Sequence, residues 1–329
     1  MMRARHWKGV LLLVALFATG LTTGRAGAME QEVTVNGGPG PLAGTLQMPD
    51  TAPPGPIPAV LMVPASGPVD RNGNGPSLRT DALRQLAQSL ALKGIASLRI
   101  DKRGVGASKA ALAREEDLRL NTYVQDTGQW LAFLRAQPGI GPIFLLGHSE
   151  GGLTAILLAE QAPVAGLILV ATPGRTYGDM MRQQLPRTDL ALDVQRAALD
   201  AITQLEQGRP VTKVPPPLMS LFRPSIQPYL ISELTIDPAA ELARTSQPVL
   251  VLQGTNDIQI DMSDAIRLSQ ARQGVRLERL EGVNHMMKNA PLNDRAGNLA
   301  TYTDPGLAIN PGITSAIVRF VRGNGAGGP

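Results

Sequence analysis

The sequence predicts an α/β protein in which a mostly parallel sheet is covered by helices on both faces. Short apolar runs alternate with longer segments of helical periodicity, which is typical of parallel strands joined by crossover helices. One such run, residues 143–146, leads into Gly147-His148-Ser149-Glu150-Gly151-Gly152, and a segment rich in helix formers follows over 153–159. A serine between glycines at a strand-to-helix turn indicates a nucleophile whose hydroxyl stands above the sheet.

The individual elements can be assigned in order along the chain. Residues 32–35 and 42–48 are expected to pair antiparallel, because Asn36-Gly37-Gly38 between them is a strong turn signal. Six later apolar runs are expected to form central strands: 59–63, 96–100, 143–147, 166–171, 248–253 and 275–280. Helices are expected between these runs, and Leu131 and Leu134 lie on the helix before the third of them.

The alternation is interrupted between residues 174 and 240. Helical patterns from Met180 to Glu206 give way there to Val214-Pro215-Pro216-Pro217 and then to another short helix. Such a break predicts an insertion, because connections in α/β units are otherwise short. Its position, after the strand that follows the serine helix, suits a lid over an active site; a purely structural excursion is an equal alternative on composition alone.

The first 28 residues are typical of a secretory signal peptide. Arg3, Arg5 and Lys8 precede an apolar stretch over 10–17, and Ala26-Gly27-Ala28 supplies a small-x-small cleavage site. The stretch is short for a bilayer span, and no cysteine follows it to carry a lipid. We therefore expect cleavage near Ala28, export to a periplasm or to the medium, no membrane anchor, and one large α/β domain over 29–329.

Charge and composition argue against several classes of partner. Four of the 31 basic residues and none of the 27 acidic ones lie in the expected leader, so the rest of the chain is balanced. Nothing in it favours a nucleic acid or an anionic lipid surface. The aromatic content of 3% argues against a stacking platform, and the absence of cysteine excludes disulfides and thiolate metal sites.

Ser149 needs a general base, and the histidine content leaves one candidate. A serine hydroxyl is a poor nucleophile at neutral pH unless a base, usually histidine, takes its proton. Of the three histidines, His6 lies in the leader, and His148 neighbours the serine on the turn, where its side chain should diverge. His285 remains; it follows the last expected strand, at the edge where open α/β sheets place their sites. The alternatives are a serine that only caps the helix and a histidine in an ordinary loop.

The carboxylate that orients this histidine is expected at Asp257. It lies in Gln253-Gly254-Thr255-Asn256-Asp257, directly after an expected strand, and so projects from the same edge. Asp261 and Asp264 are competitors, of which Asp264 looks more like a first-turn helix carboxylate. The order of nucleophile, acid and histidine is that of one hydrolase fold and differs from the order in other serine hydrolases.

With these motifs the chain resembles an α/β-hydrolase, and specifically the secreted bacterial esterase-like branch of that superfamily. The resemblance covers nearly all of the chain after the leader. It rests on the motifs at 147–152, 254–257 and 282–285, on the Asp101-Lys102-Arg103-Gly104 turn, and on Pro64-Ala65-Ser66-Gly67-Pro68. It implies an eight-stranded sheet with a helical cap, here the insertion at 174–240. Many relatives carry His-Gly where this chain has Pro64-Ala65.

The oxyanion of an acyl-transfer intermediate is expected to bind two backbone N–H groups. One belongs to Glu150, the residue after the nucleophile, and the other to Ser66 in the loop after the third strand, with Gly67 in reserve. Only the main chain of Glu150 is assigned, because its carboxylate would oppose developing negative charge unless it were paired or turned away. The alternative for residues 66–68 is an ordinary turn.

Two motifs that mimic ligand sites are discounted. Asp70-Arg71-Asn72-Gly73-Asn74-Gly75 resembles the opening of a calcium loop with Asp81 at its twelfth position, but it follows a strand and contains Pro76. The glycines of 101–106 do not complete a dinucleotide fingerprint. We expect that segment to be a structural turn in which Arg103 pairs with nearby carboxylates.

These observations predict a serine hydrolase that cleaves a small acyl ester through an acyl-enzyme, with no metal or organic cofactor. The alternatives are a peptidase or thioesterase with the same machinery, an aryl or lactone hydrolase, and a non-catalytic binding protein on the same scaffold. Acyl and alcohol specificity and the oligomeric state do not follow from these residues.

Overall fold

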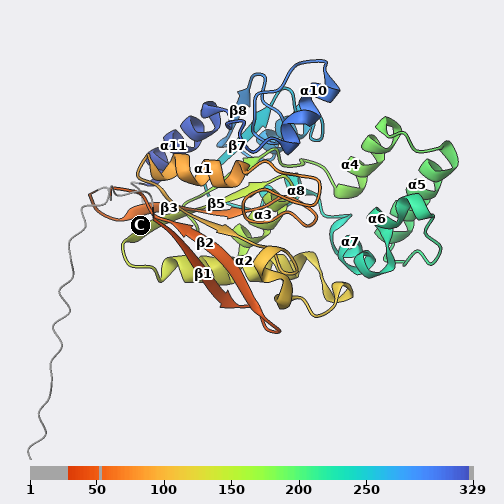
Figure 1. The fold of residues 1–329 in the computed structure, drawn as a ribbon, viewed down its shortest axis with the longest axis horizontal. Helices are drawn as coiled ribbons and strands as arrows, with labels where there is room; N and C mark the ends of the chain where they lie inside the picture. Colours follow the sequence, from red (N-terminus) through yellow and green to blue (C-terminus); the bar gives the residue numbers. More distant parts are fainter. Residues whose placement is uncertain (1–28, 52–53, 326–329) are drawn as a thin grey trace, which may run out of the picture.

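The computed structural model describes residues 29–51 and 54–325, which are drawn in colour in Figure 1. The expected leader, residues 1–28, lies outside the described residues. Among the helices that the structure describes, none has both the length and the hydropathy to cross a membrane.

The centre of the molecule is an eight-stranded sheet. Its strands are β1 (Glu30–Asn36), β2 (Pro41–Gln47), β3 (Ile57–Val63), β4 (Ala96–Ile100), β5 (Ile140–His148), β6 (Gly166–Val170), β7 (Val249–Gly254) and β8 (Val275–Leu280). They lie in the order β1-β2-β4-β3-β5-β6-β7-β8, in which β2 runs antiparallel to β1 and to β4 and the other neighbours are parallel. The predicted mostly parallel sheet is confirmed, and the carboxyl ends of β3 to β8 meet at one edge.

Helices cover both faces of this sheet. The α-helices are α1 (Ala82–Ala91), α2 (Leu120–Arg135), α3 (Gly151–Gln161), α4 (Tyr177–Gln184), α5 (Leu192–Glu206), α6 (Met219–Phe222), α7 (Gln227–Glu233), α8 (Pro238–Leu242), α9 (Met262–Gln270), α10 (Arg295–Ala300) and α11 (Pro311–Gly325). Side chains of α1 and α11 pack on one face, and those of α2, α3, α8 and α9 on the other.

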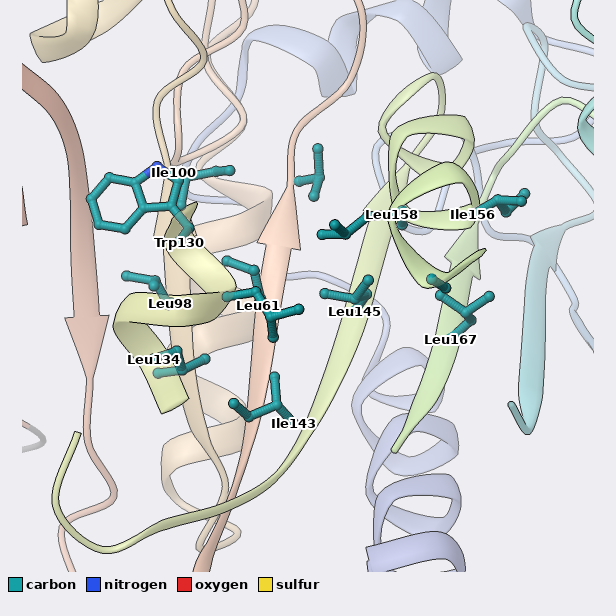
Figure 2. Close-up of a cluster of buried hydrophobic side chains, with 14 of the residues drawn as sticks. Leu61, Leu98, Ile100, Trp130, Leu134, Ile143, Leu145, Ile156, Leu158 and Leu167 are labelled. Carbon is teal, nitrogen blue, oxygen red and sulfur yellow. The ribbon is translucent and has the colours of Figure 1, made fainter. Parts of the chain in front are cut away.

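The alternation of side chains along β5 explains why both faces must be covered. Leu145 belongs to the core under α2 and α3, whereas Phe144 and Leu146 belong to the core under α1 and α11, and all three are fully buried. Figure 2 shows the first of these cores, where Leu145 lies near Leu158 of α3. Burying one such side chain stabilises the fold by roughly 1.5–3 kcal/mol, so β5 is a rigid base for the turn that follows it.

Between β6 and β7 the chain forms a separate group of helices, α4 to α7, which we call the cap. Figure 1 shows it to one side of the sheet and its covering helices. The cap has its own apolar core, which includes Ile202, Leu205, Phe222 and Leu230, and this core extends to Leu153 at the start of α3. The cap therefore packs against the helix that begins just after Ser149.

Candidate active site

The turn between β5 and α3 holds Ser149 in a strained conformation. Its φ angle is +55°, in the left-handed region that non-glycine residues rarely adopt. Its backbone N–H donates to Val170 O over 2.9 Å. The glycines around it are required by close packing: a Cβ on Gly151 would lie 2.4 Å from Val63 O, and one on Gly152 2.2 Å from Thr172 Oγ1. The predicted strand, sharp turn and helix are thus present.

Ser149 lines a cavity of about 100 Å³ between the sheet edge and the cap. The loop after β3 contributes Ser66, and the cap contributes Tyr177, Met180, Gln184 and Glu233. The remaining lining residues come from the elbow, from α3 and from the segments that follow β6 and β7: Glu150, Leu153, Pro173, Arg175, Pro238, Gln259 and Ile260. A ligand in this cavity would contact the hydroxyl of Ser149 and side chains of the cap together.

Asp257 and His285 lie together at the carboxyl ends of β7 and β8. Asp257 Oδ2 is 2.8 Å from His285 Nδ1, and both side chains are almost completely buried. The second carboxylate oxygen accepts the backbone N–H groups of Gln259 and Ile260, and Gln253 Nε2 donates to Oδ2 over 3.1 Å. Burial raises the pKa of Asp257, but His285 and these backbone donors outweigh it and leave the pKa below its ordinary value.

His148 contacts the backbone and the ring of His285. As expected, its side chain leaves the turn without serving Ser149; its Nε2 lies 2.9 Å from the backbone oxygen of His285, and the two rings are 5.0 Å apart. Burial, followed by the nearby His285 ring, lowers the pKa of His148 to about 4, so the ring is neutral at pH 7. A neutral ring with its proton on Nε2 donates to that oxygen. This contact was missed by sequence reasoning, which assigned His148 no role.

His148 connects the turn that carries Ser149 to the loop that carries His285. His148 precedes Ser149 in the chain and touches His285, so the turn and the histidine loop are neighbours. No hydrogen bond joins Ser149 Oγ to His285 Nε2. In hydrolases without substrate this contact is often long and shortens on binding.

The two expected oxyanion donors have no competing partner. Within the described chain, the backbone N–H groups of Ser66 and Glu150 donate to no other group, and both residues line the cavity with Ser149. The reserve residue, Gly67, has a φ of +68° and turns the chain away after Ser66. Lys102, which is buried, donates its ammonium to Ala65 O and so ties this loop to the turn after β4.

The carboxylate of Glu150 is held by the cap. Tyr229 of α7 donates its hydroxyl to Glu150 Oε1 over 2.7 Å in a buried contact. Lys102 is the nearby cation: burial lowers its pKa, and Glu150 and Glu233 oppose that effect. The Glu150 carboxylate lies next to the nucleophile in the sequence, but Tyr229 holds it by a hydrogen bond. Such a partner is what a buried carboxylate beside a developing negative charge requires.

The turn after β4 is structural, as predicted. Arg103 forms a two-pronged ion pair with Asp126 of α2, with N–O distances of 2.9 and 2.6 Å. Asp101 accepts the backbone N–H groups of Arg71 and Ala107. Residues 102–105 of this turn also line a second cavity of about 150 Å³, together with Tyr123 and Tyr229.

The loop that mimics a calcium site uses its carboxylates internally. Asp70 Oδ1 accepts the backbone N–H groups of Asn72 and Asn74, and Asp81 accepts from Asn74 Nδ2 over 2.6 Å. Over residues 29–51 and 54–325, no group of three or more histidine, aspartate and glutamate side chains could hold a metal ion.

The competitors of Asp257 serve α9. Asp261 is the N-cap of this helix and accepts from Ser263 N, while Asp264 lies in its first turn. Asp264 accepts the backbone N–H of Gly174 over 3.0 Å and pairs with Arg175 over 2.7 Å. The carboxylate at hydrogen-bond distance from His285 Nδ1 is that of Asp257, so the geometry favours Asp257.

Known proteins share both this fold and the nucleophile region. A family model described as serine aminopeptidase, S33, matches residues 78–212, which include Ser149. The α/β hydrolase GrgF from Penicillium sp. sh18 superposes with a TM-score of 0.59 at 20% identity, over 91% of this chain and all of that one. The chain therefore has the α/β-hydrolase fold.

Among proteins of known activity, the chain is similar in sequence to an esterase. Esterase EstD from Thermotoga maritima is 28% identical over 267 residues, which cover 78% of this chain and 60% of EstD. The chain thus spans less than two thirds of that relative. Est1E from Butyrivibrio proteoclasticus, whose structure contains ferulic acid, superposes with a TM-score of 0.57 at 17% identity over 90% of this chain and all of Est1E. This structural similarity shows the fold alone.

Proposed function

We propose that this chain hydrolyses carboxylic esters through an acyl-enzyme on Ser149. The observation that carries the proposal is the Asp257–His285 contact of 2.8 Å, packed through His148 against a strained turn that presents Ser149 to a cavity. The similarity to an esterase supports an ester as the substrate class.

The geometry assigns each group a step. His285 Nδ1 is engaged with Asp257, so Nε2 is the nitrogen that takes the proton of Ser149 as Oγ attacks the acyl carbon. Asp257, whose pKa is low, stays ionised and stabilises the imidazolium. The backbone N–H groups of Ser66 and Glu150 bind the oxyanion. His285 then protonates the leaving alcohol, and a water molecule activated by the same ring releases the acyl group.

A peptidase is the second candidate, because the family model that matches residues 78–212 describes an aminopeptidase. The same groups would serve: the leaving group is an amine, and His285 protonates it as the tetrahedral intermediate collapses. The alkoxide of an ester leaves more readily than the amine anion of an amide. Ester cleavage therefore depends less on protonation of the leaving group by His285.

The test measures kcat/KM for p-nitrophenyl esters of increasing acyl length, with aminoacyl p-nitroanilides and an acyl thioester in parallel. Ester turnover should dominate, and Ser149→Ala and His285→Ala should each lose several orders of magnitude in kcat. Ser89→Ala, on α1 and outside the cavity lining, is the matched control and should retain wild-type rates.

Each outcome decides between the candidates. Cleavage of anilides with negligible ester cleavage would make the chain a peptidase. Turnover of none of the substrates would favour a binding protein, and near-normal rates in His285→Ala would show that another group is the base.

We also propose that residues 1–28 direct export and are then removed, and that the cap controls access to the cavity. The leader pattern supports export, and the cap residues that line the cavity with Ser149 support gating. Mass spectrometry of the protein isolated from a secreting host should find a new N-terminus near residue 29; an intact Met1 would contradict export.

A further inference from the structure

Glu233 is a buried carboxyl that the proposed mechanism leaves unused. It is the last residue of α7 in the cap, is only 1% exposed, and lines the same cavity as Ser149. The inference below rests on the proposed function and concerns the substrate that this cavity accepts.

Two other polar residues of the cavity lining have hydrogen-bond partners, whereas Oε2 of Glu233 has none within the described chain. Glu150 accepts from Tyr229, and Gln184 donates to Gln259 O. Glu233 Oε2 is buried and has no hydrogen-bond partner within the described chain. Buried polar atoms are nearly always paired in folded proteins, so an unpaired one that lines an active-site cavity points to a partner supplied by the ligand.

The surrounding charges indicate what kind of partner fits. Burial, and then repulsion from Glu150, raises the pKa of Glu233 well above its ordinary value, and Lys102 opposes the rise. Lys102, whose Nζ donates to Ala65 O, is the basic side chain near both carboxyl groups. A second cation would be repelled by it, whereas a hydroxyl can both donate to and accept from a carboxyl in either protonation state.

We propose that Glu233 is a specificity-determining residue that hydrogen-bonds a neutral hydroxyl group of the substrate, so that the chain prefers short hydroxylated esters. The carboxyl acts on binding and orientation of the substrate in the cavity and takes no part in the transfer of the acyl group. Removing it should change which esters react and should leave the machinery at Ser149 intact.

The experiment compares ester pairs of nearly equal shape in which a hydroxyl replaces a methyl group. On the acyl side these are p-nitrophenyl 3-hydroxybutanoate and 3-methylbutanoate. On the alcohol side they are 2-hydroxypropyl and 2-methylpropyl butanoate. The wild-type kcat/KM should favour the hydroxylated ester about tenfold in one of the two arms, the factor that a single buried hydrogen bond supplies.

Two variants separate recognition from structure. Glu233→Met should bring the ratio of kcat/KM within the responding pair close to one, and Glu233→Gln, which resembles a neutral carboxyl, should retain the wild-type ratio. Because Glu233→Met deletes an unpaired buried group, its Tm should equal or exceed that of the wild type; a structural carboxyl would give a lower Tm. Glu206→Met is the control for the ester preference alone and not for the Tm, since Glu206 belongs to the cap and does not line the cavity but pairs with Arg182.

Several results would overturn the inference. Equal kcat/KM within both pairs for the wild type would do so, and this measurement does not depend on any variant folding. An unchanged preference in Glu233→Met, or a preference for p-nitrophenyl 3-aminobutanoate over the hydroxy ester, would also refute it. Turnover of no ester at all would instead contradict the proposed function.

Discussion

The strain at Ser149 predicts that two inactive variants differ in stability. An alanine at this position keeps a Cβ in the left-handed region, where the φ of +55° is unfavourable, whereas glycine adopts it freely. The strain costs roughly 1–2 kcal/mol, and glycine loses part of this advantage through the greater entropy of its unfolded chain. Ser149→Gly should therefore be more stable than Ser149→Ala by about 1 kcal/mol.

Urea denaturation followed by circular dichroism measures this difference, which corresponds to about 2 °C in Tm for a chain of this size. Ser89, inside α1, provides the control. There the order should reverse, with Ser89→Gly less stable than Ser89→Ala by about 1 kcal/mol, because glycine is unfavourable inside a helix. If Ser149→Gly were equal to or less stable than Ser149→Ala, the turn would not be strained and the argument from its φ angle would fail.

Three further predictions concern the contacts around the site. Asp257→Asn should lower kcat by roughly three to four orders of magnitude with little change in KM, because His285 loses its anionic partner; a loss below tenfold in stopped-flow ester hydrolysis would contradict this. The pKa of His148 is about 4 in the folded chain and near 6.5 in the unfolded chain. The unfolded chain therefore binds the proton first, and the free energy of unfolding should fall as the pH drops from about 6.5 to about 4. The loss is about 3 kcal/mol at most, and His148→Gln, which keeps a donor, should show a smaller decline in urea midpoints between pH 7.5 and 5. Arg103→Leu should cost about 3 kcal/mol in urea denaturation by leaving Asp126 unpaired, and adding Asp126→Leu should recover most of it; additive losses would argue against the pair.

The sheet could be predicted because local sequence patterns indicate its strands. Residues 96–100 and 275–280 match β4 and β8, because each is a short run between turn residues, which predicts a strand without tertiary information. Arg103 was predicted to pair with a carboxylate, and Asp126 is that partner. The spatial approach of Asp257 to His285 followed from their positions after parallel strands, because such positions meet at one edge.

The environment of the site could not be predicted in the same way. The contact of His148 with the backbone of His285 joins residues 137 positions apart, and no local pattern marks it. Tyr229 reaches Glu150, and Glu233 reaches the cavity, because the cap packs against α3, and the helical periodicity of the insertion does not determine that packing. Long-range packing of an insertion depends on tertiary contacts that the sequence pattern leaves open.

The cap is one uninterrupted stretch of chain between two neighbouring parallel strands, β6 and β7. The register of that strand pair is set by the sheet itself, while the residues that shape the far wall of the cavity come from the stretch between them. The sheet therefore fixes the positions of β6 and β7, and the cap is a separate insertion between them that shapes the cavity. We therefore expect that replacing this stretch would change substrate preference while leaving the contact between Asp257 and His285, which lie outside it, in place.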